Sequence, residues 1–411
     1  MGSNGKLPKG WREARIDNVS DVSFSSVDKK ALEDQSSVLL CNYMDVWKNP
    51  YIHRHLKFME ATASASEIEK FTLHAGDVLL TKDSETKDEI AEPSVVREQI
   101  DNLVLGYHLA LLRPKHNVAD GQFLAAQLRI PEFRNQFIRA ASGVTRYGLS
   151  MATVCGAKVW LPRFATQRKI SGILRSVDEA IEATRAVIEQ TRRLKTALLQ
   201  EFFNRENRRG NSATQRLRLR DLGHWFHGGT PSKSQSAYWN GTIPWISAKD
   251  LKQADLWDSQ DHISQSAVSA GARLAPVGTI LMLVRGMGLA KAFPVGIARV
   301  PLAFNQDIKA IIAHHDHHPD YILYWFQRNE GRLMQLADEA SHGTKKIDSD
   351  TLLSLGIELP SKAEQIRVAS ALRAVDDRIA HEIQTLAVAK TLKSALSQGL
   401  LTGRISVKGG N

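Results

Sequence analysis

Residues 161–203 read LPRFATQRKISGILRSVDEAIEATRAVIEQTRRLKTALLQEFF, and residues 359–401 read LPSKAEQIRVASALRAVDDRIAHEIQTLAVAKTLKSALSQGLL. The two stretches align without a gap at an offset of 198 residues (359 − 161 = 198). Identical residues recur along the alignment, among them Gln167 with Gln365, Asp178 with Asp376, and Lys195 with Lys393. Chance does not hold one offset over such a length, so the chain contains an internal repeat.

Each copy of the repeat is predicted to form a long helix. Apolar residues recur in steps of three and four, no proline interrupts either run, and good helix formers fill the other positions. The Leu-Pro pair at the start of each copy ends a strand, so the helix begins after it. Roughly 40 residues with a rise of 1.5 Å each make a rod of about 60 Å.

A rod with one apolar seam needs a partner, and the other copy is the obvious one. The alternative is two unrelated amphipathic helices in a core, which the shared offset disfavours. The residues expected in the core of the helix pair are Ile170, Leu174, Val177, Ile181, Ile188, Leu198, Val368, Leu372, Val375, Ile379, Leu386 and Leu396.

Size and charge limit the class of protein. A chain of 411 residues allows two to four domains, and its balance of 54 basic against 44 acidic residues gives a net charge of +10. This excess favours a polyanionic partner, although ribosome-associated and membrane-surface proteins share it. Cys41 and Cys155 lack metal-ligand spacing and are interpreted as reduced core thiols. No signal peptide and no apolar run of membrane length is recognised, so we expect a cytoplasmic protein without membrane contact.

The chain is predicted to alternate between domains and rods. The first domain spans 7–160, the first rod 161–204, a hydrophilic linker 205–215, the second domain 216–358 and the second rod 359–404. In the first domain we expect an acidic loop at 83–100, one strand at 103–112, a helix at 121–141 and a basic loop at 142–148. The second domain repeats this order, with a helix at 321–340 and a loop at 341–346. Aligning the two loops with a one-residue slip places Arg146 over Lys345.

Three short motifs resemble catalytic or ligand sites. Gly286-Met287-Gly288 lacks the third glycine of a nucleotide-binding loop and is interpreted as a loop between two strands. Asn49-Pro50-Tyr51 lacks the second proline of the amino-methyltransferase motif and is interpreted as a turn. The histidines of residues 314–318 have no remote partner ligand, so an exposed loop is favoured over a zinc site. With no hydrolase elbow, phosphate-binding loop or zinc-protease motif, we expect a non-catalytic chain that holds no metal and no cofactor.

Basic and aromatic residues fall in loops that could face a phosphate backbone. Such cations would release counterions and position a duplex, and arginines and lysines also read guanine edges. For any one of them the alternative is an ordinary solvated charge. The candidates for DNA binding are Lys82, Arg146 and Tyr147 in the first domain and Lys249, Arg285, Lys291, Lys345 and Lys346 in the second.

Further motifs resemble one protein family over nearly the whole chain. They are Leu7-Pro8-Lys9-Gly10-Trp11, Gly228-Gly229-Thr230-Pro231-Ser232-Lys233, Tyr238-Trp239, the stretch IPWISAKDL at 243–251, Leu359-Pro360 with Glu364-Gln365-Ile366, and the stretch GLLTGR at 399–404. Together they resemble the specificity subunit of type I restriction–modification systems. The first domain lacks the Gly-Gly-Thr-Pro opening, and residues 163–166 of the first rod lack the acidic residue usual in the family.

The resemblance implies an α+β fold, in which two similar mixed α/β target-recognition domains are separated by two long helices that pair as an antiparallel coiled coil. It implies that each domain reads one half of a bipartite site in double-stranded DNA and that the rods set the spacer. It also implies two modification subunits, which carry S-adenosylmethionine and methylate adenine at N6, and up to two restriction subunits, which use ATP and Mg²⁺. The alternatives are the recognition subunit of a split type II-like methyltransferase–nuclease, a coiled-coil adaptor that binds no DNA, and a stand-alone methyltransferase.

Overall fold

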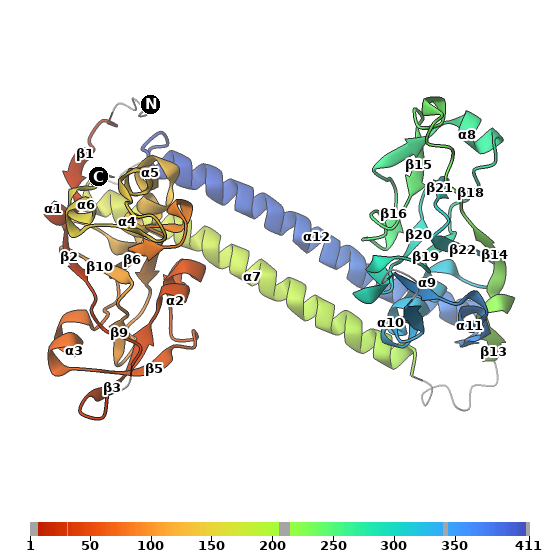
Figure 1. Ribbon diagram of the computed structural model, residues 1–411, viewed down its shortest axis with the longest axis horizontal. Helices are drawn as coiled ribbons and strands as arrows, with labels where there is room; N and C mark the ends of the chain where they lie inside the picture. Colours follow the sequence, from red (N-terminus) through yellow and green to blue (C-terminus); the bar gives the residue numbers. More distant parts are fainter. Residues whose placement is uncertain (1–6, 31, 205–213, 340–343, 408–411) are drawn as a thin grey trace. The chain divides into compact units, whose positions relative to one another are not determined.

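The computed structural model describes residues 7–30, 32–204, 214–339 and 344–407 (Figure 1). Its contacts divide the chain into two compact units, Met1–Arg185 with Gln384–Asn411, and Ala186–Ile383. Each unit contains one globular domain and about half of each long helix. Most of the predicted linker, residues 205–213, lies outside the described residues.

The two copies of the repeat form the two longest helices, α7 (Phe164–Phe202) and α12 (Lys362–Leu401). Both begin shortly after the Leu-Pro pair, as the sequence predicts. In the first unit the start of α7 packs against the end of α12, and Leu174 and Leu400 share one core. In the second unit Leu198, near the end of α7, packs against the core that contains Leu372 of α12. The predicted antiparallel helix pair is therefore confirmed.

The first domain has two layers of strands and a cover of helices. Its five-stranded sheet has the order β2 (Ser20–Phe24), β10 (Leu109–Pro114), β6 (Val78–Thr81), β8 (Pro93–Val96), β4 (Tyr51–Ile52). A three-stranded sheet has the order β5 (Met59–Ala63), β3 (Ser36–Cys41), β9 (Leu103–Leu105), and two ribbons pair β1 (Arg12–Arg15) with β12 (Lys158–Leu161) and β7 (Asp83–Ser84) with β11 (Tyr147–Gly148). The helices are α1 (Ile16–Val19), α2 (Tyr43–Lys48), α3 (Ala65–Phe71), α4 (Gly121–Arg129), α5 (Pro131–Ala140) and α6 (Met151–Gly156).

Strand β6 shows why both layers form around it. Successive side chains of a strand point to opposite faces. Val78 and Leu80 pack in the core that contains α4 and the long helices, while Leu79 packs in the core of the three-stranded sheet. All four residues of β6 are buried. A continuous apolar run therefore indicates a central strand covered on both faces.

The second domain repeats this plan. Its five-stranded sheet has the order β14 (Gly223–His227), β22 (Ile308–Ala313), β19 (Ile280–Leu283), β20 (Val295–Ala298), β16 (Asp255–Leu256). A four-stranded sheet has the order β17 (Asp261–Ile263), β15 (Ile243–Ile246), β21 (Leu302–Phe304), β18 (Leu274–Ala275), and two ribbons pair β13 (Gln215–Arg218) with β25 (Gly356–Leu359) and β23 (Ala337–Glu339) with β24 (Lys345–Ile347). The helices are α8 (Gln265–Ser269), α9 (Pro319–Arg328), α10 (Glu330–Met334) and α11 (Ser349–Ser354).

Two strand predictions for the first domain are wrong. The expected loop at 83–100 contains β8, a fully buried central strand. Its sequence signal is only a Val-Val pair soon after a proline, which did not indicate a central strand. The expected strand at 103–112 is two strands, β9 and β10, which belong to different sheets. The chain crosses between them at Gly106, where a side chain would come within 2.9 Å of the Cys41 carbonyl oxygen.

Two predicted helices are each interrupted in the structure. The helix expected at 121–141 breaks between α4 and α5, because Pro131 forces Ile130 into an extended conformation. The helix expected at 321–340 begins earlier, at Pro319, and breaks at Asn329. Its last predicted turns are strand β23.

Both cysteines are free thiols. Cys41 is buried, as expected. The expectation of a core thiol is wrong for Cys155, which is only partly buried on α6.

Candidate nucleic-acid interface

A buried glutamine joins each long helix to the domain beside it. Gln167 on α7 accepts a hydrogen bond from the backbone N–H of Asp120, the residue that caps α4, at 2.9 Å. Its Nε2 donates to the carbonyl oxygens of Pro162 at 3.0 Å and Val118 at 3.1 Å. One side chain thus satisfies backbone groups at the starts of two helices, which would otherwise be buried without partners.

The second unit repeats this joint at the same offset. Gln365 on α12 accepts from the backbone N–H of His318, which caps α9, at 2.8 Å. It donates to the carbonyl oxygen of Pro360 at 2.9 Å. His318 and Pro360 lie 198 residues after Asp120 and Pro162, so the repeat continues into the domains, where sequence identity is low.

An ion pair between α7 and α12 also occurs once in each unit. In the second unit Lys195 Nζ lies 2.7 Å from a carboxylate oxygen of Asp376, and the Tyr324 hydroxyl donates to the same carboxylate at 2.9 Å. Burial raises the pKa of Tyr324, and the charge of Asp376 raises it further, so the phenol remains a proton donor. The three groups connect both long helices to α9.

In the first unit the repeat places the same two charges on the opposite helices. Lys393 of α12 pairs with Asp178 of α7, and the Tyr51 hydroxyl donates to Asp178 at 2.6 Å. Burial, together with the hydrogen bond to Asp178, raises the pKa of Tyr51. Tyr51 comes from β4 and Tyr324 from α9, so two unrelated positions supply the same phenol.

The twelve residues predicted for the helix-pair core are all at least partly buried. The six with almost no exposed surface are Ile170, Leu174, Ile181, Ile188, Val368 and Leu372. The six that are partly buried are Val177, Leu198, Val375, Ile379, Leu386 and Leu396.

The basic loops of the two domains are held by equivalent backbone pairings. Leu149 donates its N–H to the carbonyl oxygen of Lys82 at 2.9 Å, and Ile347 donates to that of Val284 at 2.9 Å. Gly148 then lies opposite Asp83, and Lys346 opposite Arg285. Leu149 and Ile347 are again 198 residues apart.

This register corrects the predicted alignment of the two loops. The one-residue slip that placed Arg146 over Lys345 is wrong, because the constant offset places Tyr147 over Lys345. Arg146 corresponds to Thr344. The slip was inferred from similar residue types in a loop, whereas the backbone pairing fixes the equivalence.

The structure places the three first-domain candidates next to one another but gives them different surroundings. The side chain of Lys82 is largely buried, pairs with Asp83 at 2.6 Å and lies over the Tyr107 ring. Arg146 is exposed. Tyr147 is partly buried in β11 and lies under the ammonium group of Lys87.

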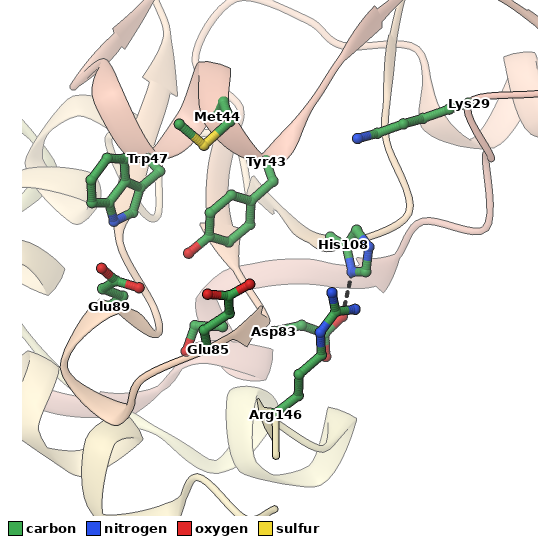
Figure 2. A pocket seen from close by; sticks show the side chains of 10 residues that line it. Lys29, Tyr43, Met44, Trp47, Asp83, Glu85, Glu89, His108 and Arg146 are labelled. Atoms are coloured by element: carbon green, nitrogen blue, oxygen red, sulfur yellow. Dashed lines mark hydrogen bonds and ion pairs between the residues drawn. The ribbon is translucent and has the colours of Figure 1, made fainter.

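A cavity of about 390 Å³ opens between helix α2 and the loop that follows β7 (Figure 2). Figure 2 shows the Tyr43 and Trp47 rings on one side, with Glu85 and Glu89 facing them and Arg146 at the edge. Its lining residues are Lys29, Tyr43, Met44, Trp47, Asp83, Ser84, Glu85, Glu89, His108 and Arg146.

This cavity is chemically mixed. Burial raises the pKa of Tyr43, and the nearby charges of Glu89 and Glu85 raise it further, which keeps its hydroxyl protonated. Carboxylates accept hydrogen bonds from amino groups such as N4 of cytosine, whereas an arginine donates to guanine or phosphate. The surface around Arg146 is therefore suited to reading base edges more than to holding phosphates.

Four of the five second-domain candidates come together. Arg285 and Lys291 flank a short 3-10 turn, η5 (Met287–Ala290), and Lys345 and Lys346 lie on β24 beside it. The backbone N–H of Gly286 donates to the carbonyl oxygen of Lys345 at 2.9 Å. Among the described residues, none of these four side chains forms an ion pair, although Lys345 and Lys346 lie opposite Glu339 and Asp338 in the β23–β24 ribbon.

Lys249 lies apart from this cluster. It pairs with Asp261 at 2.7 Å, and that hydrogen bond raises the pKa of Lys249. A cavity of about 660 Å³ that includes Asp261 is lined in addition by Trp239, Trp245 and His262. Lys249 is thus part of a separate surface of the second domain.

Sequence reasoning missed several polar residues that join domain and helix. Arg299 and Arg373 both contact Asp255 and Asp320, with Arg299 at 2.6 Å from Asp255 and 2.5 Å from Asp320. Burial alone would raise the pKa of Asp320, but the two guanidinium groups outweigh it and hold that pKa below its usual value. The one available signal was the identity of Arg175 and Arg373 within the repeat, and it gave no hint of the partners.

Lys309 is a second polar residue that the sequence did not reveal. It is buried in β22 and donates to the Ser349 hydroxyl at 2.7 Å, which connects the central sheet to the start of α11. Burial lowers the pKa of Lys309.

Two absences apply to the described residues alone. Within them, no group of three or more His, Cys, Asp or Glu side chains is placed to hold a metal ion. No helix in the same part of the chain combines the length and apolar character needed to cross a membrane.

Comparison with known proteins gives consistent results. Residues 211–390 match a family model described as the type I restriction modification DNA specificity domain. The chain is 35% identical over 160 residues to the type I restriction enzyme EcoR124I/EcoR124II specificity subunit of Escherichia coli, a match that covers 38% of this chain and 40% of that protein. The matched part thus spans less than half of that relative's length.

Solved structures resemble the chain over nearly its full length. A type I restriction–modification system S subunit from M. genitalium matches with a TM-score of 0.60 and 14% identity, covering 99% of each chain. A chain from a structure described as the basis of complex assembly and conformational transition of the type I R-M system matches with a TM-score of 0.59 and 18% identity, covering 97% of this chain and 100% of that one. At such identities the likeness concerns the fold.

Proposed function

We propose that this chain is a specificity subunit of a type I restriction–modification system and that it binds double-stranded DNA through both of its globular domains; the family-model match and the similarity to known specificity subunits support this. Each domain reads one half of a bipartite site, and the paired helices α7 and α12 set the length of the unread spacer. The chain acts in the cytoplasm, where that DNA lies.

The observation that carries this proposal is the duplicated joint between helix and domain. The glutamine joint and the lysine–aspartate ion pair occur once in each unit, formed by residues that are equivalent at the offset of 198, and a tyrosine from an unrelated position joins each ion pair. The surfaces that the two units present differ, with carboxylates around Arg146, and around Arg285 cations that form no ion pair with any described residue. A duplicated frame with two different surfaces is what a reader of two unlike half-sites requires.

The same repeat supports the docking of two identical partners. Leu194 on α7 and Leu392 on α12 are equivalent positions, and each is 51% exposed. A large apolar side chain is exposed to solvent at both copies of this position. Two equivalent exposed leucines would give the chain two copies of one protein-binding surface. We assign these surfaces to two modification subunits.

The chemistry belongs to the partners. The modification subunits bind S-adenosylmethionine and methylate adenine at N6 after flipping the base out of the duplex. Up to two restriction subunits add ATP- and Mg²⁺-dependent translocation and cleavage. This chain contributes recognition, spacing and docking, and no catalytic group.

DNA binding is tested with the purified complex of this chain and its modification subunit. Methylated adenines are first mapped in a host that carries the system, which defines both half-sites. Fluorescence anisotropy on that duplex should then show specific binding, with a binding constant whose logarithm falls linearly with the logarithm of salt concentration. Binding that is equal for a scrambled duplex and does not depend on salt would favour the coiled-coil adaptor that binds no DNA. Methyl transfer by the purified chain alone would favour the stand-alone methyltransferase.

Partner docking is tested by the stoichiometry of that complex. Leu194→Asp and Leu392→Asp should each remove one modification subunit, and the double variant should remove both. Analytical ultracentrifugation measures the loss, with Arg193→Asp, an exposed neighbour on α7, as the control. Two modification subunits retained by the double variant would refute this docking surface.

A further inference from the structure

The second domain exposes an apolar side chain in the middle of its cation cluster. Met287 is 66% exposed and lies between Gly286 and Gly288 at the start of η5. Single exposed apolar residues are common on protein surfaces and need no explanation by themselves. Arg285 and Lys291 at the ends of this turn, and Lys346 on the neighbouring strand, make this one unusual.

The turn that carries Met287 is anchored on both sides. Gly286 has φ +137°, a conformation that other residues rarely adopt, and its N–H is bonded to Lys345. Leu289, two residues after Met287, is buried in the domain core. The backbone therefore fixes the place from which Met287 projects, while its unbranched side chain retains three rotatable bonds.

The first domain combines the same features at another place. Val144 is 96% exposed and follows Gly143, which has φ +143°. A side chain at Gly143 would collide with the Arg146 carbonyl oxygen, so this turn too is tightly closed. Each domain thus carries one apolar side chain on a glycine-bearing turn beside candidate DNA-binding cations.

Cations and an apolar group contact different parts of a duplex. Phosphate contacts position a protein but carry no sequence information, which is read at base edges. The C5-methyl of thymine is the apolar group that the major groove presents. We propose that Met287 contacts the C5-methyl of a thymine in the half-site of the second domain, and so determines specificity at that base pair. This inference rests on the proposed DNA-binding function.

The test removes the methyl group from the DNA and the thioether from the protein. Each thymine of the second half-site is replaced in turn by deoxyuracil, which lacks only the C5-methyl, and binding is measured for the complex with the modification subunit. One substitution should weaken wild-type binding about fourfold, the effect of one buried methyl-sized group. Met287→Ala should lose a similar factor on the normal duplex and should not distinguish thymine from deoxyuracil at that position.

Three variants make the result specific. Met287→Gln keeps the length of the side chain and should behave like Met287→Ala, whereas Met287→Leu should keep the preference for thymine. Val277→Ala, which shortens a 59% exposed side chain in the turn before β19, should retain the wild-type response to deoxyuracil. If Met287→Ala does not fold, comparing Met287→Gln with Met287→Leu still tests whether Met287 determines the preference for thymine.

Several outcomes would overturn the inference. They are a second half-site without thymine, wild-type binding that is indifferent to deoxyuracil at every position, or a Met287→Gln protein that discriminates as the wild type does. Any of these leaves the proposed DNA-binding function intact when specific binding is present. Absence of specific binding by the wild-type complex would overturn both proposals.

Discussion

Asp376→Ala should destabilise the second unit far more than the loss of an ordinary surface ion pair. The Asp376 and Lys195 side chains are only 23% and 19% exposed, so their attraction is less screened than that of exposed pairs. Removing Asp376 also leaves the Tyr324 hydroxyl without its charged acceptor and Lys195 without its counter-charge. Exposed pairs contribute about 0.2–1 kcal/mol, and breaking a fully buried pair costs about 3–5 kcal/mol. Because this pair is only partly buried, we expect Asp376→Ala to lower the free energy of unfolding by about 2–3 kcal/mol, between these two ranges.

The measurement is urea denaturation of the full chain, combined with amide hydrogen exchange in peptides from α12. Exchange assigns the loss to one unit, which a global transition of a two-unit protein does not. Glu182→Ala is the control, since Glu182 and Arg185 form a pair on α7 with 68% and 50% exposed side chains and should cost under about 0.5 kcal/mol. Asp178→Ala should reproduce the effect of Asp376→Ala in the first unit.

A double-mutant cycle isolates the pair itself. Asp376→Ala and Lys195→Ala should together cost less than the sum of the single changes, by about 1 kcal/mol. Tyr324→Phe should account for about another 1 kcal/mol, the contribution of one hydrogen bond. Equal costs for Asp376→Ala and Glu182→Ala, or strict additivity in the cycle, would refute the reasoning.

Three further predictions concern the joint, the histidines and the cation cluster. Gln365→Leu should cost about 2–4 kcal/mol, because it leaves the His318 N–H and the Pro360 carbonyl unbonded, whereas the exposed Gln384→Leu should be nearly neutral in the same denaturation assay. Burial lowers the pKa of His317 and His318, so the unfolded chain binds protons that the folded domain does not as the pH falls below about 6.5. Stability of the second unit should therefore decrease from pH 7.5 to 5.5, and His318→Gln should flatten this dependence while the exposed His315→Gln does not; an unchanged slope would exclude this cause. Lys345→Glu should weaken DNA binding and reduce its salt dependence at the second half-site alone, and unchanged footprints on both half-sites would remove Lys345 from the interface.

The sequence predicted the two long helices and their pairing, but little of the surfaces around the DNA-binding candidates. The long helices were predictable because a shared offset and a period of three to four residues depend on the chain alone. Strand β8 was missed because four residues beginning with Pro93 carry almost no periodic signal, although neighbouring strands bury all of them. The break at Pro131 was available from the sequence, since proline restricts the residue before it.

The glutamines of the joint could be recognised in the sequence, but their hydrogen-bond partners could not. Gln167 and Gln365 were visible as identical residues in the repeat, but their partners Asp120 and His318 differ in type and act through backbone N–H groups. Backbone donors leave no trace in a sequence comparison. Tyr51 and Tyr324 were unpredictable for another reason, because the phenol reaches the equivalent aspartate of the repeat from a strand in one unit and from a helix in the other.

The contacts of the joint indicate which parts of the two halves were free to diverge in sequence. The contacts that recur at the offset of 198 residues are backbone pairings, a buried glutamine and an ion pair between the helices. The glutamine and the ion pair fix the placement of a domain on the helices and lie outside the loops proposed to read DNA, whereas the backbone pairings anchor those loops. The loop after β7 carries Glu85 and Glu89, whereas the equivalent loop after β19 carries Arg285 and Lys291. A change of recognised sequence in either half therefore requires no change in the joint, so exchanging the loop residues of one domain should alter one half-site and leave the spacer as it was.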